Sequence, residues 1–303
     1  IYSCSRDTTL RQWNRSNSSA LQVFEGHELA CTALALSAAE QTLCSGSRDT
    51  SVRTWDVETG TCTASAKVPR NLVTCLKYLS ADSTAGSVVQ GGEDLRLRVW
   101  DLREAALRPS LTVEGYTFFP LCLDVSSGSH EVLTSCKGFD GQGCETKLWD
   151  LRNTGSPVRE YKGHTQDTTA CVFLDYAQAG ESGGGRHKED ETGPKNDGSH
   201  NSGSCAPTPA KLVATASKDG TIKIYDRDSG DIVVDHVEEE CGGYTGLAFR
   251  HDPVTGCIVL YASTITGGLY AFQLEAATGG GAGGGLRGFR LRCVAFVRGI
   301  PIL

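Results

Sequence analysis

The sequence predicts an all-β protein, a β-propeller built from four-stranded antiparallel blades, and three observations predict it. A Trp-Asp pair or a close variant recurs at Trp13-Asn14, Trp55-Asp56, Trp100-Asp101, Trp149-Asp150 and Tyr225-Asp226, with a degenerate copy at Tyr270. The anchors are spaced by 42, 45, 49, 76 and 45 residues, and propeller blades repeat every 40–45 residues or so. An Asp stands six residues before four of the six anchors, at Asp7, Asp49, Asp94 and Asp219.

The stretch 45–56 shows the repeating unit most clearly. It reads as the end of one strand, a turn at Arg48-Asp49-Thr50 and a second strand that closes on Trp55-Asp56. A short Asp side chain in such a turn accepts hydrogen bonds from nearby backbone N–H groups. A Gly-His pair and an apolar strand precede this stretch. Together these features are the signature of one blade of a WD-repeat propeller.

The first two units follow from this template. Residues 1–14 supply the second and third strands of a unit whose outer strand is 20–24, and its first strand is expected before Ile1. The second unit begins at Gly26-His27, and its strands are expected at 31–36, 42–47, 51–55 and 61–66.

The third and fourth units depart from the template in their loops. The third has strands at 72–78, 88–92 and 97–101, and the loop before it, Pro69-Arg70-Asn71, lacks Gly-His. The fourth has strands at 121–125, 132–136 and 146–150, and a long Gly-rich turn at 137–144.

The last two units carry low-complexity segments. The fifth begins at Gly163-His164 with strands at 169–174, 212–217 and 221–226, interrupted by residues 177–210. That insert is rich in Gly, Ser and charged residues, so we expect it to be disordered. The sixth has strands at 246–249, 258–262 and 268–272, then a Gly-rich loop at 278–288 before the strand 289–296. All six units form one propeller domain, residues 1–303.

Composition excludes several classes of function. A net charge of −7 argues against general binding to nucleic acid or to anionic membranes. No apolar run approaches the 20 or so residues of a membrane span. The 13 cysteines include no Cys-x-x-Cys pair, so we interpret most of them as small buried residues in a reducing compartment. No spacing of ligands predicts a metal, and no motif predicts a cofactor.

The repeated polar residues are interpreted as structural. His27, Asp49 and Trp55, with Ser45 or Ser47, are expected to form a buried chain of hydrogen bonds. A His, a Ser and an Asp also occur in hydrolases, but this spacing recurs along the chain, whereas an enzyme needs one site. The residues assigned to structure are His27, His164, Asp7, Asp49, Asp94, Asp219, Trp13, Trp55, Trp100 and Trp149.

Blade topology separates two faces. The loop leading into a blade and its second-to-third turn share one face, and both low-complexity segments fall on the other. The short-turn face therefore holds the candidate partner-binding residues: Arg6, Arg48, Arg70, Asn71, Glu93, Phe139 and Lys218. Phe139 lies in the Gly-rich turn, which is either an exposed recognition loop or a long turn without a function.

Two consecutive units contain the pattern Trp-Asp-Leu-Arg, ending at Arg103 and Arg152. Trp-Asp-x-Arg in neighbouring blades resembles the motif by which substrate receptors dock on the adaptor of cullin-4 ubiquitin ligases. The alternative is an Arg that follows Trp-Asp on a solvated strand end.

Longer segments resemble a narrower family, that of WD repeat-containing protein 31 of ciliated organisms. They are residues 89–94 through Trp100-Asp101, residues 138–152 with Gly143-Cys144-Glu145, and residues 160–174. The resemblance spans approximately residues 40–225; the insert 177–210 and the C-terminal Gly-rich run depart from the family.

This resemblance implies seven blades in the intact protein, with about one further blade ahead of Ile1. It implies a non-enzymatic scaffold in the cytoplasm that acts in cilium or axoneme assembly or trafficking, at the cilium or basal body. Its expected partners are ciliary or cytoskeletal proteins, without nucleic acid and without direct membrane insertion. Docking on the cullin-4 adaptor is the alternative.

Overall fold

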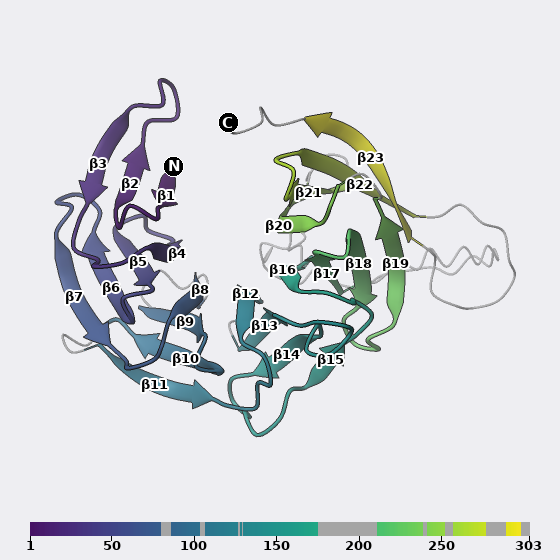
Figure 1. Cartoon of the computed structure of the whole chain (residues 1–303), viewed down its shortest axis with the longest axis horizontal. Helices are drawn as coiled ribbons and strands as arrows, with labels where there is room; N and C mark the ends of the chain where they lie inside the picture. Colours follow the sequence, from purple (N-terminus) through teal and green to yellow (C-terminus); the bar gives the residue numbers. More distant parts are fainter. Residues whose placement is uncertain are drawn as a thin grey trace, which may run out of the picture.

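The computed structural model describes residues 1–79, 86–103, 107–126, 128, 130–174, 211–238, 241–251, 257–276 and 289–297. Within these residues, strands form six antiparallel sheets placed one after another around a centre (Figure 1). The described part contains no helix, and hence none long and apolar enough to cross a membrane. The predicted all-β propeller is confirmed. The predicted insert 177–210 and Gly-rich loop 278–288 lie outside the described residues.

We number the blades in chain order. Blade one has three strands, β1 (Tyr2–Cys4), β2 (Leu10–Trp13) and β3 (Ala20–Phe24). Blade two contains β4 (Cys31–Leu36), β5 (Thr42–Ser47), β6 (Ser51–Asp56) and β7 (Cys62–Lys67). Blade three contains β8 (Val73–Tyr78), β9 (Ser87–Gly92), β10 (Arg96–Asp101) and β11 (Arg108–Val113).

Blades four to six repeat the same order. Blade four contains β12 (Pro120–Val125), β13 (Glu131–Cys136), β14 (Thr146–Asp150) and β15 (Arg159–Tyr161). Blade five contains β16 (Thr168–Phe173), β17 (Leu212–Ser217), β18 (Thr221–Asp226) and β19 (Ile232–Val237). Blade six contains β20 (Tyr244–His251), β21 (Ile258–Thr264), β22 (Leu269–Ala276) and β23 (Phe289–Val297).

The first strand of each four-stranded blade lies at the centre and the fourth at the rim. Figure 1 shows β4, β8, β12, β16 and β20 innermost, and β7, β11, β15, β19 and β23 outermost. In this view the arc is open between blade one and blade six. The inner strands therefore bring residues from different blades to a common centre, although these residues are far apart in the sequence.

The core lies between neighbouring blades. Val52 of blade two, for example, belongs to the same buried cluster as Val73 and Trp100 of blade three. The rings of Trp55, Trp100 and Trp149 are all nearly inaccessible to solvent. Because each aromatic anchor buries a large apolar area between two sheets, the repeated Trp stabilises the stacking of the blades.

Candidate interaction surface

A buried chain of hydrogen bonds joins the motif residues of blade two. The Trp55 indole N–H donates to Ser45 Oγ at 2.8 Å, and His27 Nε2 lies 2.7 Å from the same oxygen. His27 Nδ1 lies 2.9 Å from Asp49 Oδ2. The structure thus selects Ser45 over Ser47 as the hydroxyl between the two rings.

The environment shifts the pKa of both ionisable groups in this chain. Burial lowers the pKa of His27, and this exceeds the opposing effect of its hydrogen bond to Asp49. Burial works to raise the pKa of Asp49, but hydrogen bonds from Ser51, the Glu28 backbone N–H and His27 outweigh it, so that pKa lies below its usual range. The favoured state is a neutral imidazole beside a carboxylate.

Blade five repeats this chain with different side chains. His164 Nδ1 lies 3.1 Å from Asp219 Oδ2, and His164 Nε2 lies 2.8 Å from Thr215 Oγ1. Tyr225 stands where Trp stands in blade two, and its hydroxyl donates to the Lys162 carbonyl at 3.2 Å. The pKa of Asp219 is lowered because hydrogen bonds from His164, Thr221 and the Thr165 N–H outweigh the effect of burial.

Asn71 does not lie on the exposed rim, and that prediction is wrong. Its side chain is fully buried. Asn71 Nδ2 donates to Gln90 Oε1 at 3.1 Å, and Gln90 Nε2 donates back to Asn71 Oδ1 at 2.9 Å. The Trp100 indole N–H donates to Gln90 Oε1 at 3.3 Å. The paired amides of Asn71 and Gln90 therefore form the buried hydrogen-bond chain next to the Trp of blade three. His27 and Ser45 form the corresponding chain in blade two.

Sequence reasoning also missed the substitute in blade four. Tyr116 follows Gly115 in the loop before β12, as His27 follows Gly26, and its hydroxyl lies 3.0 Å from Thr134 Oγ1. Its ring centre lies 5.4 Å from that of Trp149. The signal in the sequence was the pair Gly115-Tyr116, a Gly followed by an aromatic residue at the place of Gly-His. In the structure Gly115 has a positive φ, as Gly26 does.

The other two repeated Asp residues act within their own turns. Asp94 forms an ion pair with Arg98, whose side chain is buried; Arg98 Nη1 lies 3.1 Å from Asp94 Oδ1. Asp7 is half exposed and bonds to Thr9 and Arg11 beside it. In the same blade as Asp7, the Trp13 indole N–H donates to Ser3 Oγ at 2.8 Å.

The charged candidates on the short-turn face lie at the surface. Arg6, Arg48, Arg70 and Lys218 are exposed, and Glu93 is half buried. Arg48 Nη2 of blade two lies 3.9 Å from Glu93 Oε1 of blade three. Lys218 Nζ lies 2.7 Å from Asp167 Oδ2, within blade five. This face therefore carries charges of both signs.

Phe139 projects from the Gly-rich turn of blade four and is 78% exposed. The turn itself is fixed, because Phe139 and Gln142 exchange two backbone hydrogen bonds at 3.0 Å. The Gly141 N–H donates to the Thr165 carbonyl, and the Gly138 N–H donates to Asp167 Oδ1, each at 3.0 Å. The turn is thus attached to the loop that leads into blade five.

Arg103 and Arg152 occupy matching positions in blades three and four. Each guanidinium lies against the Asp of its own Trp-Asp pair: Arg103 Nη2 is 2.6 Å from Asp101 Oδ2, and Arg152 Nη2 is 2.7 Å from Asp150 Oδ2. These hydrogen bonds lower the pKa of each carboxyl to about 2. Both Arg side chains remain about two-thirds exposed.

The described residues hold no group of three or more His, Cys, Asp or Glu side chains arranged for a metal ion. Their cysteines are free thiols, and most are buried. Burial raises the pKa of Cys44 and of Cys136 to about 12. Such thiols are protonated at neutral pH and pack as small apolar side chains.

Comparison with known proteins finds repeats of this kind. The profile described as "WD domain, G-beta repeat" matches residues 18–56 and 199–226. The chain is 34% identical over 160 residues to "Ribosome biogenesis protein WDR12 homolog" of Oryza sativa subsp. japonica, covering 51% of this chain and 33% of that protein. It is 28% identical over 190 residues to "Nuclear distribution protein nudF" of Aspergillus niger, covering 57% and 42%.

A third relative is "Nuclear distribution protein PAC1" of Gibberella zeae, 28% identical over 145 residues, with 48% of this chain and 25% of that protein covered. The chain therefore spans less than half the length of each of these relatives. None of these three names refers to a cilium.

Proposed function

We propose that this WD-repeat propeller is a non-enzymatic scaffold that binds other proteins, and that Phe139 anchors its binding surface. The observation that carries the proposal is an aromatic residue, 78% exposed, on a turn held by three backbone–backbone hydrogen bonds and by one from the Gly138 N–H to the Asp167 carboxylate. Aromatic anchors supply much of the binding energy at protein interfaces, and a rigid turn loses little entropy when a partner binds.

The charges around the turn support the same proposal. Asp167 belongs to the loop that holds the Phe139 turn, and it forms an ion pair with Lys218. On the same face, the Arg48–Glu93 pair places charges of both signs between blades two and three. A central apolar anchor with a polar, charged rim is the usual composition of an interface between proteins that also exist apart.

The burial of the His and Asp side chains supports a function without catalysis. His27 and Asp49 have 0% and 1% of their side chains exposed, and His164 and Asp219 have 1% and 8%. A catalytic residue must touch its substrate, so side chains enclosed within a blade are unsuited to catalysis. Their hydrogen bonds instead satisfy polar groups inside the sheet.

For the cellular role, we propose cilium or axoneme assembly or trafficking, with the protein at the cilium or basal body. The support is the resemblance of residues 89–94, 138–152 and 160–174 to the family of WD repeat-containing protein 31. Proximity labelling by the full-length protein in ciliated cells tests this. Labelling of ciliary or cytoskeletal proteins is expected; labelling confined to nuclear or ribosomal proteins would contradict it.

The binding surface is tested by cross-linking and affinity capture from the same cells. Phe139→Ala is expected to reduce the captured partner about tenfold or more, as for a hot-spot aromatic residue. Val158→Ala is the matched control, because Val158 is also exposed, by 54%, but lies outside the Phe139 turn. Equal capture by parent and Phe139→Ala would contradict the assignment of the anchor.

The alternative is docking on the cullin-4 adaptor through Arg103 and Arg152. The specific observation in its favour is that both guanidiniums are held in the same way in adjacent blades and are about two-thirds exposed. Co-purification with that adaptor, lost in Arg103→Ala combined with Arg152→Ala, would favour this alternative. Absence of the adaptor from the captured proteins would remove it.

A further inference from the structure

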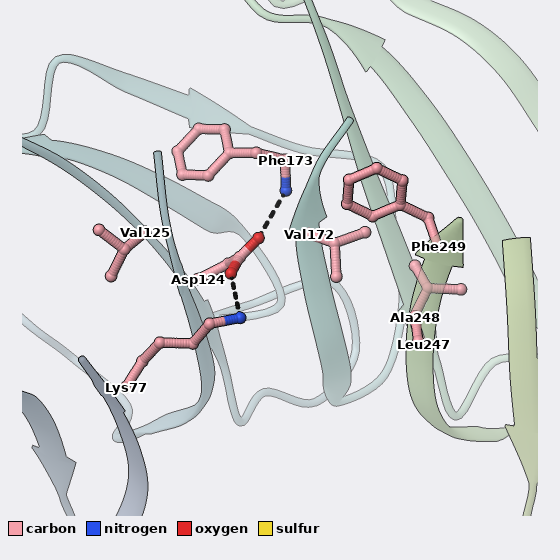
Figure 2. A pocket seen from close by; sticks show the side chains of 8 residues that line it. All are labelled: Lys77, Asp124, Val125, Val172, Phe173, Leu247, Ala248 and Phe249. Atoms are coloured by element: carbon pink, nitrogen blue, oxygen red, sulfur yellow. Dashed lines mark hydrogen bonds and ion pairs between the residues drawn. The ribbon is translucent and has the colours of Figure 1, made fainter. Parts of the chain in front are cut away.

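Four inner strands line a cavity of about 410 Å³ that is partly open to solvent (Figure 2). It lies among Lys77 of β8, Asp124 of β12, Val172 and Phe173 of β16, and Leu247 and Phe249 of β20. Ligand pockets commonly range from 300 to 1,000 Å³ or so. The cavity is thus large enough for one bulky side chain and the backbone beside it.

The cavity lies toward the face opposite the Phe139 turn. Pro120, at the start of β12, pairs with Cys136, which comes just before that turn. Asp124 stands near the other end of the same strand. A ligand in the cavity would therefore approach from the other side of the propeller and leave Phe139 free.

Asp124 links three blades and has both of its oxygens occupied. Lys77 Nζ of β8 lies 2.5 Å from Asp124 Oδ1, and the Phe173 N–H of β16 donates to Asp124 Oδ2 at 2.9 Å (Figure 2). The Asp124 side chain is only 9% exposed, whereas that of Lys77 is 51% exposed. The more accessible member of this pair is therefore Lys77.

This asymmetry determines the charge of a suitable ligand. An ammonium group carries three N–H donors, so Lys77 retains donors for a second acceptor after its contact with Asp124. A cationic ligand would have to displace Lys77 from a carboxylate that is already paired and nearly enclosed. A carboxylate requires no such displacement, and its hydrogen bond to an ammonium group is strengthened by charge.

The remaining wall is apolar. Val172 is buried, and Leu247 and Phe249 are half-buried residues that pack against the large core cluster of blades five and six. Figure 2 shows Val172, Ala248 and Phe249 on the side of the cavity away from Lys77. An aliphatic or aromatic group placed there would lose water-exposed area.

We propose that this cavity binds an extended segment of a partner protein in which a carboxylate stands next to a bulky apolar side chain. The carboxylate contacts Lys77, and the apolar side chain packs on Val172, Leu247 and Phe249. Asp124 positions Lys77. This site rests on the proposed scaffold function, because its ligand belongs to a partner, and it adds a second contact on the face opposite Phe139.

The probe is N-acetyl-leucyl-phenylalanine, which has a free carboxylate. It is titrated into the full chain by calorimetry, and the corresponding C-terminal amide is titrated in a parallel experiment. Saturable one-site binding of the acid is expected, about tenfold tighter than that of the amide. Lys77→Met should remove this preference. Lys67→Met is the matched control, because Lys67 is 49% exposed and also pairs with an acid, Glu28, but lies on the outer strand β7.

A second variant, Ala248→Trp, fills the cavity from an exposed position and leaves the Lys77–Asp124 pair in place. It should abolish binding of the acid while circular dichroism and the melting temperature stay as in the parent. Equal affinity for acid and amide, or tighter binding of phenethylamine, would overturn the proposal. Phe139→Ala should not change probe binding, so failure of this site and failure of the Phe139 surface are distinguishable.

Discussion

His27 Nδ1 lies 2.9 Å from Asp49 Oδ2, and neither side chain has more than 1% of its surface exposed. Asp49 also accepts the backbone N–H groups of Glu28 and Ser51. One carboxylate thus fixes both the turn that contains it and the loop that leads into the blade. Removing it leaves a buried imidazole and two N–H groups without their acceptor, and unpaired buried donors are costly.

Asp49→Ala is therefore expected to lower the free energy of unfolding by about 1–3 kcal/mol. Asp7→Ala is the control, because Asp7 stands at the same place in its repeat but is 47% exposed and bonds only to Ser5, Thr9 and Arg11 nearby in the chain. Asp7→Ala should cost less than about 0.5 kcal/mol. Urea unfolding of both variants measures the difference. Equal losses would contradict the structural assignment of Asp49.

The same pair makes stability depend on pH. In the unfolded chain His27 takes up a proton near its ordinary pKa of about 6.5, whereas burial lowers its pKa in the folded protein. As the pH falls below about 6.5 the unfolded state binds more protons, so the free energy of unfolding decreases. The lowered pKa of Asp49 adds a further decrease below about pH 4, where the unfolded carboxyl is protonated first.

Urea midpoints measured between pH 7.5 and 5 test the contribution of His27. His27→Gln is expected to be less stable than the parent at pH 7.5 but to lose less stability as the pH falls. A loss with pH as steep in the variant as in the parent would assign the effect to other groups.

The repeat could be predicted from the sequence because Trp55, Trp100 and Trp149 occupy the same buried position on the third strand of their blades. They therefore recur at nearly regular intervals along the chain. The His27–Asp49 contact was also predictable, because few partners satisfy a buried imidazole. Asn71–Gln90 and Tyr116–Thr134 were not predicted, since several polar pairs satisfy the same buried position. The attachment of the Phe139 turn to the loop before blade five depends on packing between blades, which no local pattern encodes.

Asn71→Ala tests the amide pair of blade three. The change removes two hydrogen bonds of the fully buried Gln90 side chain, which keeps only its contacts with the Trp100 indole N–H and the Gly91 carbonyl. We expect a loss of about 1–3 kcal/mol in the free energy of unfolding. Arg70→Ala, one residue earlier and exposed, should change stability by less than about 0.5 kcal/mol. Thermal and urea unfolding give the comparison; similar losses in both variants would show that Gln90 finds another partner.

Gly143 and Gly141 separate two effects in the Phe139 turn. Both have φ of +74°, so Ala at either position carries the same backbone strain. A Cβ atom on Gly143 would lie 2.0 Å from Phe118 Cδ2, whereas one on Gly141 meets no atom within 4 Å. Gly143→Ala should therefore be less stable than Gly141→Ala by about 1–3 kcal/mol, the usual cost of overpacking. Equal urea midpoints would mean that Phe118 moves aside freely.

Deleting residues 177–210 tests whether blade five folds without its insert. The two sides of the insertion are already joined, because the Leu174 N–H donates to the Leu212 carbonyl at 2.9 Å and Phe173 pairs with Val213. The deletion leaves Asp175, Tyr176 and Lys211 between the paired ends, and three-residue loops are common in β-hairpins. Because loop-closure entropy changes slowly with loop length, the urea midpoint should stay close to that of the parent. A variant that aggregates, or that unfolds without a cooperative transition, would show that the insert contributes to the blade.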